Sequence, residues 1–175
     1  MKKYVFFDST KRVLGKVIFL LCALFVCQVQ ASMAPFGLEV GKTTMDDLKK
    51  KVTFTEIAKN PYYGWNHWVK DPQQLKDVKA VEALFVVDED GILQAIALWK
   101  DKTLFDQELG SFSKEYQAVK RQTPAVGDKY VEFRDSHSNI VILEVTYKID
   151  SQLFELHQTP LFHKKYKEKE NQTKS

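Results

Sequence analysis

Two apolar, β-branched runs on either side of an acidic turn constrain the fold of this chain most strongly. The runs span residues 81–87 and 92–99, and residues 88–91 between them read Asp-Glu-Asp-Gly. An Asp-Gly pair supplies the positive φ that tight hairpin turns require. The sequence therefore predicts an antiparallel hairpin. The turn lacks the twelfth-position glutamate of an EF-hand loop, so we interpret it as a turn and not as a calcium site.

Two segments have the apolar periodicity of amphipathic helices. Residues 43–51 begin with Thr43 and Thr44, either of which can cap a first turn, and apolar side chains then recur at helical spacing. Residues 103–120 carry a longer apolar stripe. Its members are Phe105, Leu109, Phe112, Tyr116 and Val119.

The remaining apolar segments read as further strands, and together they indicate an α+β fold. The predicted strands cover residues 65–70, 129–134, 140–148 and 153–157. We expect two helices packed on an antiparallel sheet. Because residues 41–100 and 103–158 share one order of elements, we interpret them as two similar helix-plus-strands halves. We place a single domain at residues 32–160 and a polar, flexible tail at residues 161–175, with a short helix over residues 161–169 as the alternative.

Residues 1–31 have the three regions of a secretory signal peptide. A basic segment ends at Lys16, residues 17–27 form an unbroken apolar run, and small residues precede a cleavage point between Ala31 and Ser32. Eleven apolar residues are fewer than the ~20 that span a bilayer comfortably. We therefore expect an exported protein with a periplasmic location, and secretion or membrane attachment are the alternatives.

Both cysteines of the chain, Cys22 and Cys27, lie in this leader. A mature domain that begins at Ser32 thus has no disulfide, no thiolate nucleophile and no cysteine metal ligand. Residues 24–26 lack the small residue expected before a lipidated cysteine. We expect membrane attachment only if the leader is retained or Cys27 is lipidated.

The basic charge of the chain also belongs to the leader. Residues 1–31 hold five basic residues and one acidic residue, whereas residues 32–175 hold 21 basic and 22 acidic residues. The mature domain has no global positive field, so we expect no nucleic-acid partner.

The sequence carries no catalytic or metal-binding motif. It contains no Gly-x-Ser-x-Gly elbow, no glycine-rich phosphate loop and no Ser-x-x-Lys motif. The four histidines show neither the i, i+4 spacing of a helical metal site nor a Cys/His cluster. We therefore predict no catalytic residues, no metal and no cofactor.

Residues 62–68 are the most unusual segment, since they hold four aromatic residues and a histidine. Aromatic side chains contribute strongly at interfaces. We predict that Tyr62, Tyr63, Trp65, His67 and Trp68 form a binding surface. Alternatively, both tryptophans pack the core beneath the helix at residues 103–120. If strand alternation holds, Trp65 and Trp68 point to opposite faces.

The first residues of the expected domain resemble a known opening. Residues 36–48 read Phe-Gly-Leu-Glu-Val-Gly-Lys-Thr-Thr-Met-Asp-Asp-Leu. Exported bacterial domains of the SmpA/OmlA type, and the related β-lactamase-inhibitor-like domains, begin with a Gly-x-Thr-x-x-Asp/Glu-Val/Leu helix followed by antiparallel strands. The resemblance covers roughly residues 36–100. The chain departs from it by lacking a good lipidation box and the Leu-Gly-x-Pro turn after Val52.

This resemblance implies an interaction domain of the bacterial envelope and not an enzyme. We therefore expect a non-enzymatic binding protein whose partner is an envelope protein. Two alternatives stay open. One is a glycan- or cell-wall-binding module that uses the aromatic segment 62–68. The other is a small hydrolase, for which Glu132, Asp135 and His137 are the local cluster to test.

Overall fold

The computed structural model describes residues 34–173 apart from residues 136, 138 and 148–151. These residues belong to the compact unit Met33–Ser175. The expected signal peptide, its cleavage point between Ala31 and Ser32, and both cysteines lie outside the described residues. No helix in the described part of the chain is long and apolar enough to cross a membrane.

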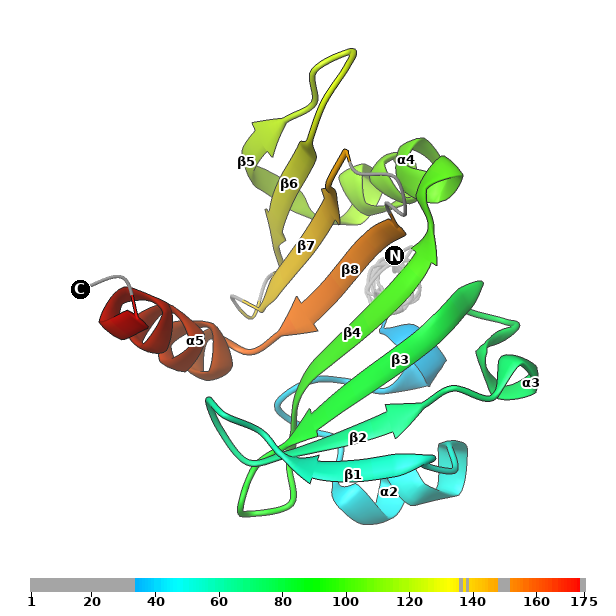
Figure 1. The fold of residues 1–175 in the computed structure, drawn as a ribbon, viewed down its shortest axis with the longest axis vertical. Helices are drawn as coiled ribbons and strands as arrows, with labels where there is room; N and C mark the ends of the chain where they lie inside the picture. The colour runs from blue at the N-terminus through cyan, green and yellow to red at the C-terminus, as the bar shows by residue number, and fades with distance from the viewer. Residues whose placement is uncertain (1–33, 136, 138, 148–151, 174–175) are drawn as a thin grey trace, which may run out of the picture. The chain divides into compact units, whose positions relative to one another are not determined.

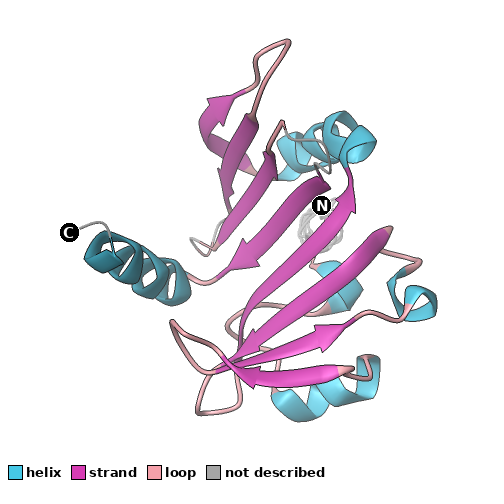
Figure 2. Cartoon of the chain, viewed as in Figure 1, coloured by secondary structure: helices cyan, strands magenta, loops and turns pink. Residues whose placement is uncertain are grey.

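The elements alternate between short helices and runs of strands (Figures 1 and 2). The first half consists of η1 (Pro35–Gly37), α2 (Met45–Lys51), β1 (Glu56–Lys59), β2 (Trp65–Val69), α3 (Pro72–Leu75), β3 (Ala80–Val87) and β4 (Leu93–Asp101). The second half consists of η2 (Lys102–Leu104), α4 (Phe105–Glu115), β5 (Gln117–Gln122), β6 (Lys129–Arg134), β7 (Ile140–Val145), β8 (Gln152–Gln158) and α5 (Pro160–Thr173).

All eight described strands form one antiparallel sheet in the order β1-β2-β3-β4-β8-β7-β6-β5. Figure 1 shows this order from β1 at the bottom to β5 at the upper left. Each half is a meander of four strands, and the two meanders join where β4 pairs with β8. The expected mixture of helices and antiparallel strands is therefore confirmed.

One face of the sheet, which we call the helix face, carries α2 and α4. Leu48 of α2 packs with side chains of β2, β3 and β4, such as Val69 and Phe85. Phe105 and Phe112 of α4 pack with side chains of β6, β7 and β8. Each half of the sheet thus has its own apolar core on this face.

Among the described residues, the opposite face, which we call the open face, is covered by a helix only at one end. Val86 follows the core residue Phe85 in β3, and Ala95 precedes the core residue Ile96 in β4. Because side chains alternate along a strand, both point to the open face. Phe162 of α5 packs against both and is 6% exposed. The rest of the open face holds the cavity described below.

The predicted hairpin at residues 81–99 is present as β3 and β4. The Asp88 carboxylate accepts hydrogen bonds from the backbone N–H groups of Asp90 (3.0 Å) and Ile92 (2.8 Å) and from Gln94 Nε2 (2.7 Å). Gly91 has the positive φ of 78° that the turn was expected to require. The first predicted helix is also confirmed as α2, and Thr44 caps it by accepting the Asp47 N–H.

The second predicted helix is wrong beyond residue 115. Residues 117–122 form the edge strand β5, although the apolar stripe continues to Val119. Tyr116 is the last residue of the stripe that packs into the core, and Val119 is exposed. As a strand, β5 pairs with the backbone hydrogen-bonding groups along the outer edge of β6. A longer helix would leave those groups of β6 without a strand partner. Tertiary pairing therefore overrides the local periodicity here.

Two further expectations are corrected. Four α-helices rather than two occur in the described residues, because Asp71 caps the short α3 and the C-terminal segment is also helical. The flexible tail expected at residues 161–175 is wrong for residues 160–173, which form α5, and the structure has the helix that was the alternative for residues 161–169. The burial of Phe162 against the open face gives this polar helix its anchor.

Candidate functional site

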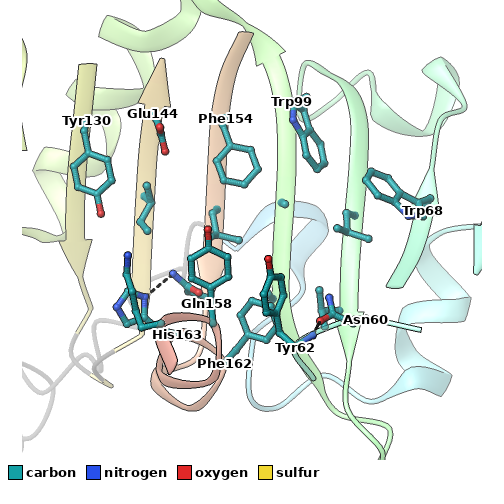
Figure 3. A pocket seen from close by; sticks show the side chains of 18 residues that line it. Asn60, Tyr62, Trp68, Trp99, Tyr130, Glu144, Phe154, Gln158, Phe162 and His163 are labelled. Atoms are coloured by element: carbon teal, nitrogen blue, oxygen red, sulfur yellow. Dashed lines mark hydrogen bonds between the residues drawn. The ribbon is translucent and has the colours of Figure 1, made fainter. Parts of the chain in front are cut away.

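The open face contains a trough of about 330 Å³. It crosses six strands, from β2 to β6, and α5 and the β1–β2 loop border it along one side (Figure 3). Its lining is mostly apolar. The lining side chains are Asn60, Tyr62, Trp68, Leu84, Val86, Ala95, Ala97, Trp99, Tyr130, Ile142, Glu144, Phe154, Leu156, Gln158, Phe162, His163, Tyr166 and Lys167.

The floor of the trough is low because β4 contributes two small side chains, Ala95 and Ala97. Strand register places Leu84 of β3 and Leu156 of β8 on either side of Ala97. The larger neighbours stand above the alanine methyl group, which leaves a depression along β4. A cavity of this volume falls at the lower end of ligand pockets, which run from about 300 to 1,000 Å³.

A row of aromatic rings forms one wall of the trough. Trp68 stacks on Trp99 with ring centroids 5.5 Å apart, and Trp99 packs against Phe154 at 5.3 Å. These side chains stand on the same face of the sheet in Figure 3. Lys70 lies 5.3 Å from the Trp68 ring. Because each indole ring already has aromatic or cationic neighbours, the wall is held rigid and closely packed.

The β1–β2 loop is fixed by an asparagine. The Asn60 side chain donates to Asn66 Oδ1 (2.6 Å) and accepts the N–H groups of Tyr62 (2.7 Å) and Tyr63 (2.9 Å). Gly64 follows with a φ of +73°, and a Cβ there would overlap the backbone of β3 at Val87. A glycine is therefore required where the loop meets the sheet.

Helix α5 forms the opposing wall and is tied to that loop. Tyr166 meets the Tyr62 ring edge-on, with centroids 5.0 Å apart. Gln158 Nε2 donates to His163 Nδ1 at 3.0 Å, which is the dashed bond in Figure 3. Burial lowers the pKa of His163, so its ring is neutral near pH 7. Gln158 Oε1 is buried and has no hydrogen-bond partner among the described residues.

Few charged groups line the trough. Lys167 of α5 pairs with Glu170 at 3.0 Å. Glu144 of β7 lies opposite Phe154 and Tyr130 in the strand register, and it has no hydrogen-bond or ion-pair partner among the described residues. Burial and the charge of the neighbouring Glu132 raise the pKa of Tyr130, which therefore stays protonated. The trough thus holds one carboxylate beside neutral aromatic rings.

The structure distributes the five predicted binding residues over different surroundings. Tyr62 and Trp68 line the trough. Tyr63 packs against the cluster of Val86, Ala95 and Phe162. Its ring centroid lies 5.4 Å from the ammonium nitrogen of Lys165.

The other two predicted residues lie away from the trough. Trp65 is 46% exposed, and His67 is buried on the helix face against Phe54, with ring centroids 4.7 Å apart. As strand alternation predicted, residues 65 and 68 of β2 point to opposite faces, and neither tryptophan packs beneath α4.

Sequence reasoning missed most of the trough. Residues 95, 97 and 99 alternate along β4 as Ala, Ala and Trp, which is a period-two signal for a low floor beside a tall wall. The sequence contains this alternation, but the alternation does not determine which face of the sheet the helices cover. The contributions of Tyr130, Glu144 and Phe154 depend on the pairing of β8 with β4, which joins distant parts of the chain.

A second cavity of about 310 Å³ lies on the helix face at the junction of the two halves. Its polar lining includes Lys100, whose ammonium lies 2.9 Å from Glu108 and 2.7 Å from Glu155. His157 Nε2 donates to the other oxygen of Glu155 at 2.8 Å. These charges satisfy one another, so we interpret the cluster as a structural link between β4, β8 and α4.

The three residues of the hydrolase alternative line neither cavity. Asp135 accepts the backbone N–H groups of His137 and Asn139, each at 2.8 Å, which is the role of a turn residue. Glu132 accepts hydrogen bonds from Tyr130 and Arg134. Among the described residues, no group of three or more His, Cys, Asp or Glu side chains is arranged to hold a metal ion.

Comparison of the chain with protein-family models, curated proteins and solved structures found no match.

Proposed function

We propose that this chain is a non-enzymatic binding protein and that the trough on the open face is its binding site. The observation that carries the proposal is an apolar depression walled by aromatic rings on a sheet face that helices otherwise leave open. Apolar centres with aromatic residues are typical of recognition surfaces. The floor and the aromatic wall come from strands, which supports a preformed site.

The ligand we propose is a segment of a partner protein that inserts apolar side chains over Ala95 and Ala97. The trough runs across the strands instead of ending in a deep, closed chamber, which suits an extended segment. Its volume lies at the lower end of the range of ligand pockets, which suits a few side chains of such a segment. The segment would enter between Trp99 and α5.

Glycan binding through residues 62–68 is the second proposal, and one observation favours it. Trp65 is exposed at the start of β2 and lies outside the trough. A sugar ring needs an accessible aromatic face, and Trp68 offers less because Trp99 and Lys70 lie against it. A glycan would therefore bind at Trp65, whereas a protein segment would bind at Trp68 and Trp99.

Export to the periplasm and an envelope protein as partner remain part of the proposal. The support for export is the leader pattern in residues 1–31. The helix–strand order that the SmpA/OmlA resemblance implies over residues 36–100 is compatible with α2 followed by β1 to β4. We further propose that the halves α2–β4 and α4–β8 are structural repeats, supported by their common helix-then-meander order.

The test is selection from a random peptide display library on three forms of the protein. Ala97→Phe fills the floor of the trough, because Ala97 is 5% exposed beneath it. Ala118→Phe places the same ring on the exposed strand β5, away from the trough. Circular dichroism first establishes that both variants fold.

We expect the wild type and Ala118→Phe to enrich the same apolar peptides and Ala97→Phe to lose them. If all three forms enrich the same peptides, the trough is not the site. If cell-wall fragments quench the fluorescence of the wild type, and Trp65→Phe abolishes the quenching, the glycan proposal replaces it.

A further inference from the structure

Glu144 gives the trough a charge that its other polar groups do not neutralise. The carboxylate lines a largely apolar cavity and has no hydrogen-bond or ion-pair partner in the described part of the chain. Burying a carboxylate without a partner is unfavourable, and filling the trough would take water away from Glu144. An occupant therefore has to supply a donor at this point.

The cations of the open face are already engaged elsewhere. Lys70 pairs with Glu82 at 3.3 Å, Lys167 pairs with Glu170, and Arg134 pairs with Glu132 at 3.2 Å. Lys120 lies over the Tyr130 ring at 4.9 Å. None of these contacts involves Glu144, so no described residue of the chain supplies a positive charge to it, and a ligand can do so.

The surroundings of Glu144 suit an organic cation. The strand register places Phe154 on one side of Glu144 and Tyr130 on the other, and directly opposed positions bring Cβ atoms to about 5 Å. Aromatic rings attract cations through their negative faces. A carboxylate between two aromatic side chains thus combines an ion pair with an apolar enclosure for the stem of a long basic side chain.

We propose that the trough selects a protein segment that carries a lysine or arginine side chain, which pairs with Glu144. This inference rests on the proposed function and names the chemistry of its ligand. Strands β4 and β7 are separated only by β8, which puts about 10 Å between them, and an extended segment covers that distance in about three residues. The segment therefore has its basic residue about three positions from the apolar residue that lies over Ala97.

The test compares two peptides that differ only in charge. The probes are acetyl-Leu-Ser-Leu-Arg-amide and its counterpart with citrulline, a neutral analogue of arginine. Tryptophan fluorescence titration gives the dissociation constant of each peptide. We expect the wild type to bind the arginine peptide about tenfold more tightly, because charge-assisted hydrogen bonds to a carboxylate are stronger than the neutral ones that citrulline can make.

Three variants make the test specific. Glu144→Gln should reduce the preference to within twofold, and Glu144→Lys should reverse it in favour of a peptide with glutamate in place of arginine. Glu132→Gln is the matched control, because Glu132 lies on the same face but binds Arg134 and Tyr130 and does not line the trough. It should retain the tenfold preference.

The outcomes separate the two proposals. Equal binding of both peptides, unaffected by Glu144→Gln, would leave the trough as a binding site and overturn the charge inference. Loss of the preference in Glu132→Gln but not in Glu144→Gln would also overturn it. If Ala97→Phe leaves the binding of both peptides unchanged, or if neither peptide binds, the proposed function fails and the inference fails with it.

Discussion

Replacing Lys100 by methionine should destabilise the protein by about 3–5 kcal/mol. Lys100 is 5% exposed and Glu155 is 2% exposed, so neither charge is solvated in the folded protein. Methionine preserves the apolar stem of the lysine but removes its charge. The substitution leaves the carboxylates of Glu155 and Glu108 without the ammonium group that bridges them.

The magnitude follows from the geometry of the cluster. At 2.7 Å and 2.9 Å, and with an effective dielectric constant of about 20, each contact represents about 6 kcal/mol of gross attraction. Desolvation of the three charges offsets most of this, so the cluster adds little net stability. Removing only the cation is different, because breaking a buried pair leaves an uncompensated charge and typically costs 3–5 kcal/mol.

Urea denaturation at pH 7, followed by circular dichroism, measures the free energy of unfolding. The double variant Lys100→Met/Glu155→Gln should be less destabilised than Lys100→Met alone, because the amide removes the charge left unpaired. A loss below about 1 kcal/mol for Lys100→Met would refute the reasoning, since the carboxylates would then be solvated. So would a double variant that loses the full sum of the two single changes.

Three other predictions concern pH, a glycine and α5. Burial lowers the pKa of His67 from its usual 6.5. Burial tends to raise the pKa of Glu155, but hydrogen bonds and charges from His157 and Lys100 outweigh it and lower that pKa below 4.5. Both folded-state pKa values are depressed, so the unfolding free energy should fall in two steps as the pH drops below 6.5 and then below 4.5; a urea midpoint constant from pH 7 to pH 3 would contradict this. Gly64→Ala should lose about 2 kcal/mol or more to backbone strain, whereas Gly110→Ala, in open space on α4, should gain up to about 1 kcal/mol in the same assay. Phe162→Ala should speed amide hydrogen exchange in α5, and the exposed Leu161→Ala should not; equal exchange would show that Phe162 does not anchor the helix.

Local signals in the sequence were sufficient for the elements that depend on neighbouring residues. The hairpin follows from an Asp-Gly turn between two apolar runs, and α2 follows from a capping threonine. The boundaries of β6 were also predicted, because its ends coincide with turn residues. In each case the residues that decide the structure lie within a few positions of one another.

The rest of the fold depends on contacts between distant residues. The helical periodicity continues to Val119, but residues 117–122 pair with β6 as a strand. Phe162 is the buried residue that anchors the polar α5, and no periodicity singles it out. The binding surface also depends on contacts between distant residues, and of the predicted binding residues only Tyr62 and Trp68 line the trough. Its remaining wall forms where β8 from one half pairs with β4 from the other.

The measurement that tests the central claim most directly is fluorine NMR of the protein labelled with 5-fluorotryptophan. The chain has three tryptophans, of which Trp68 and Trp99 line the trough and Trp65 lies outside it. Single Trp→Phe variants assign the three resonances. On addition of a peptide selected by the wild type, we predict that the signals of Trp68 and Trp99 shift while that of Trp65 stays in place. A shift confined to Trp65, or no shift at saturating peptide, would contradict the assignment of the trough as the binding site.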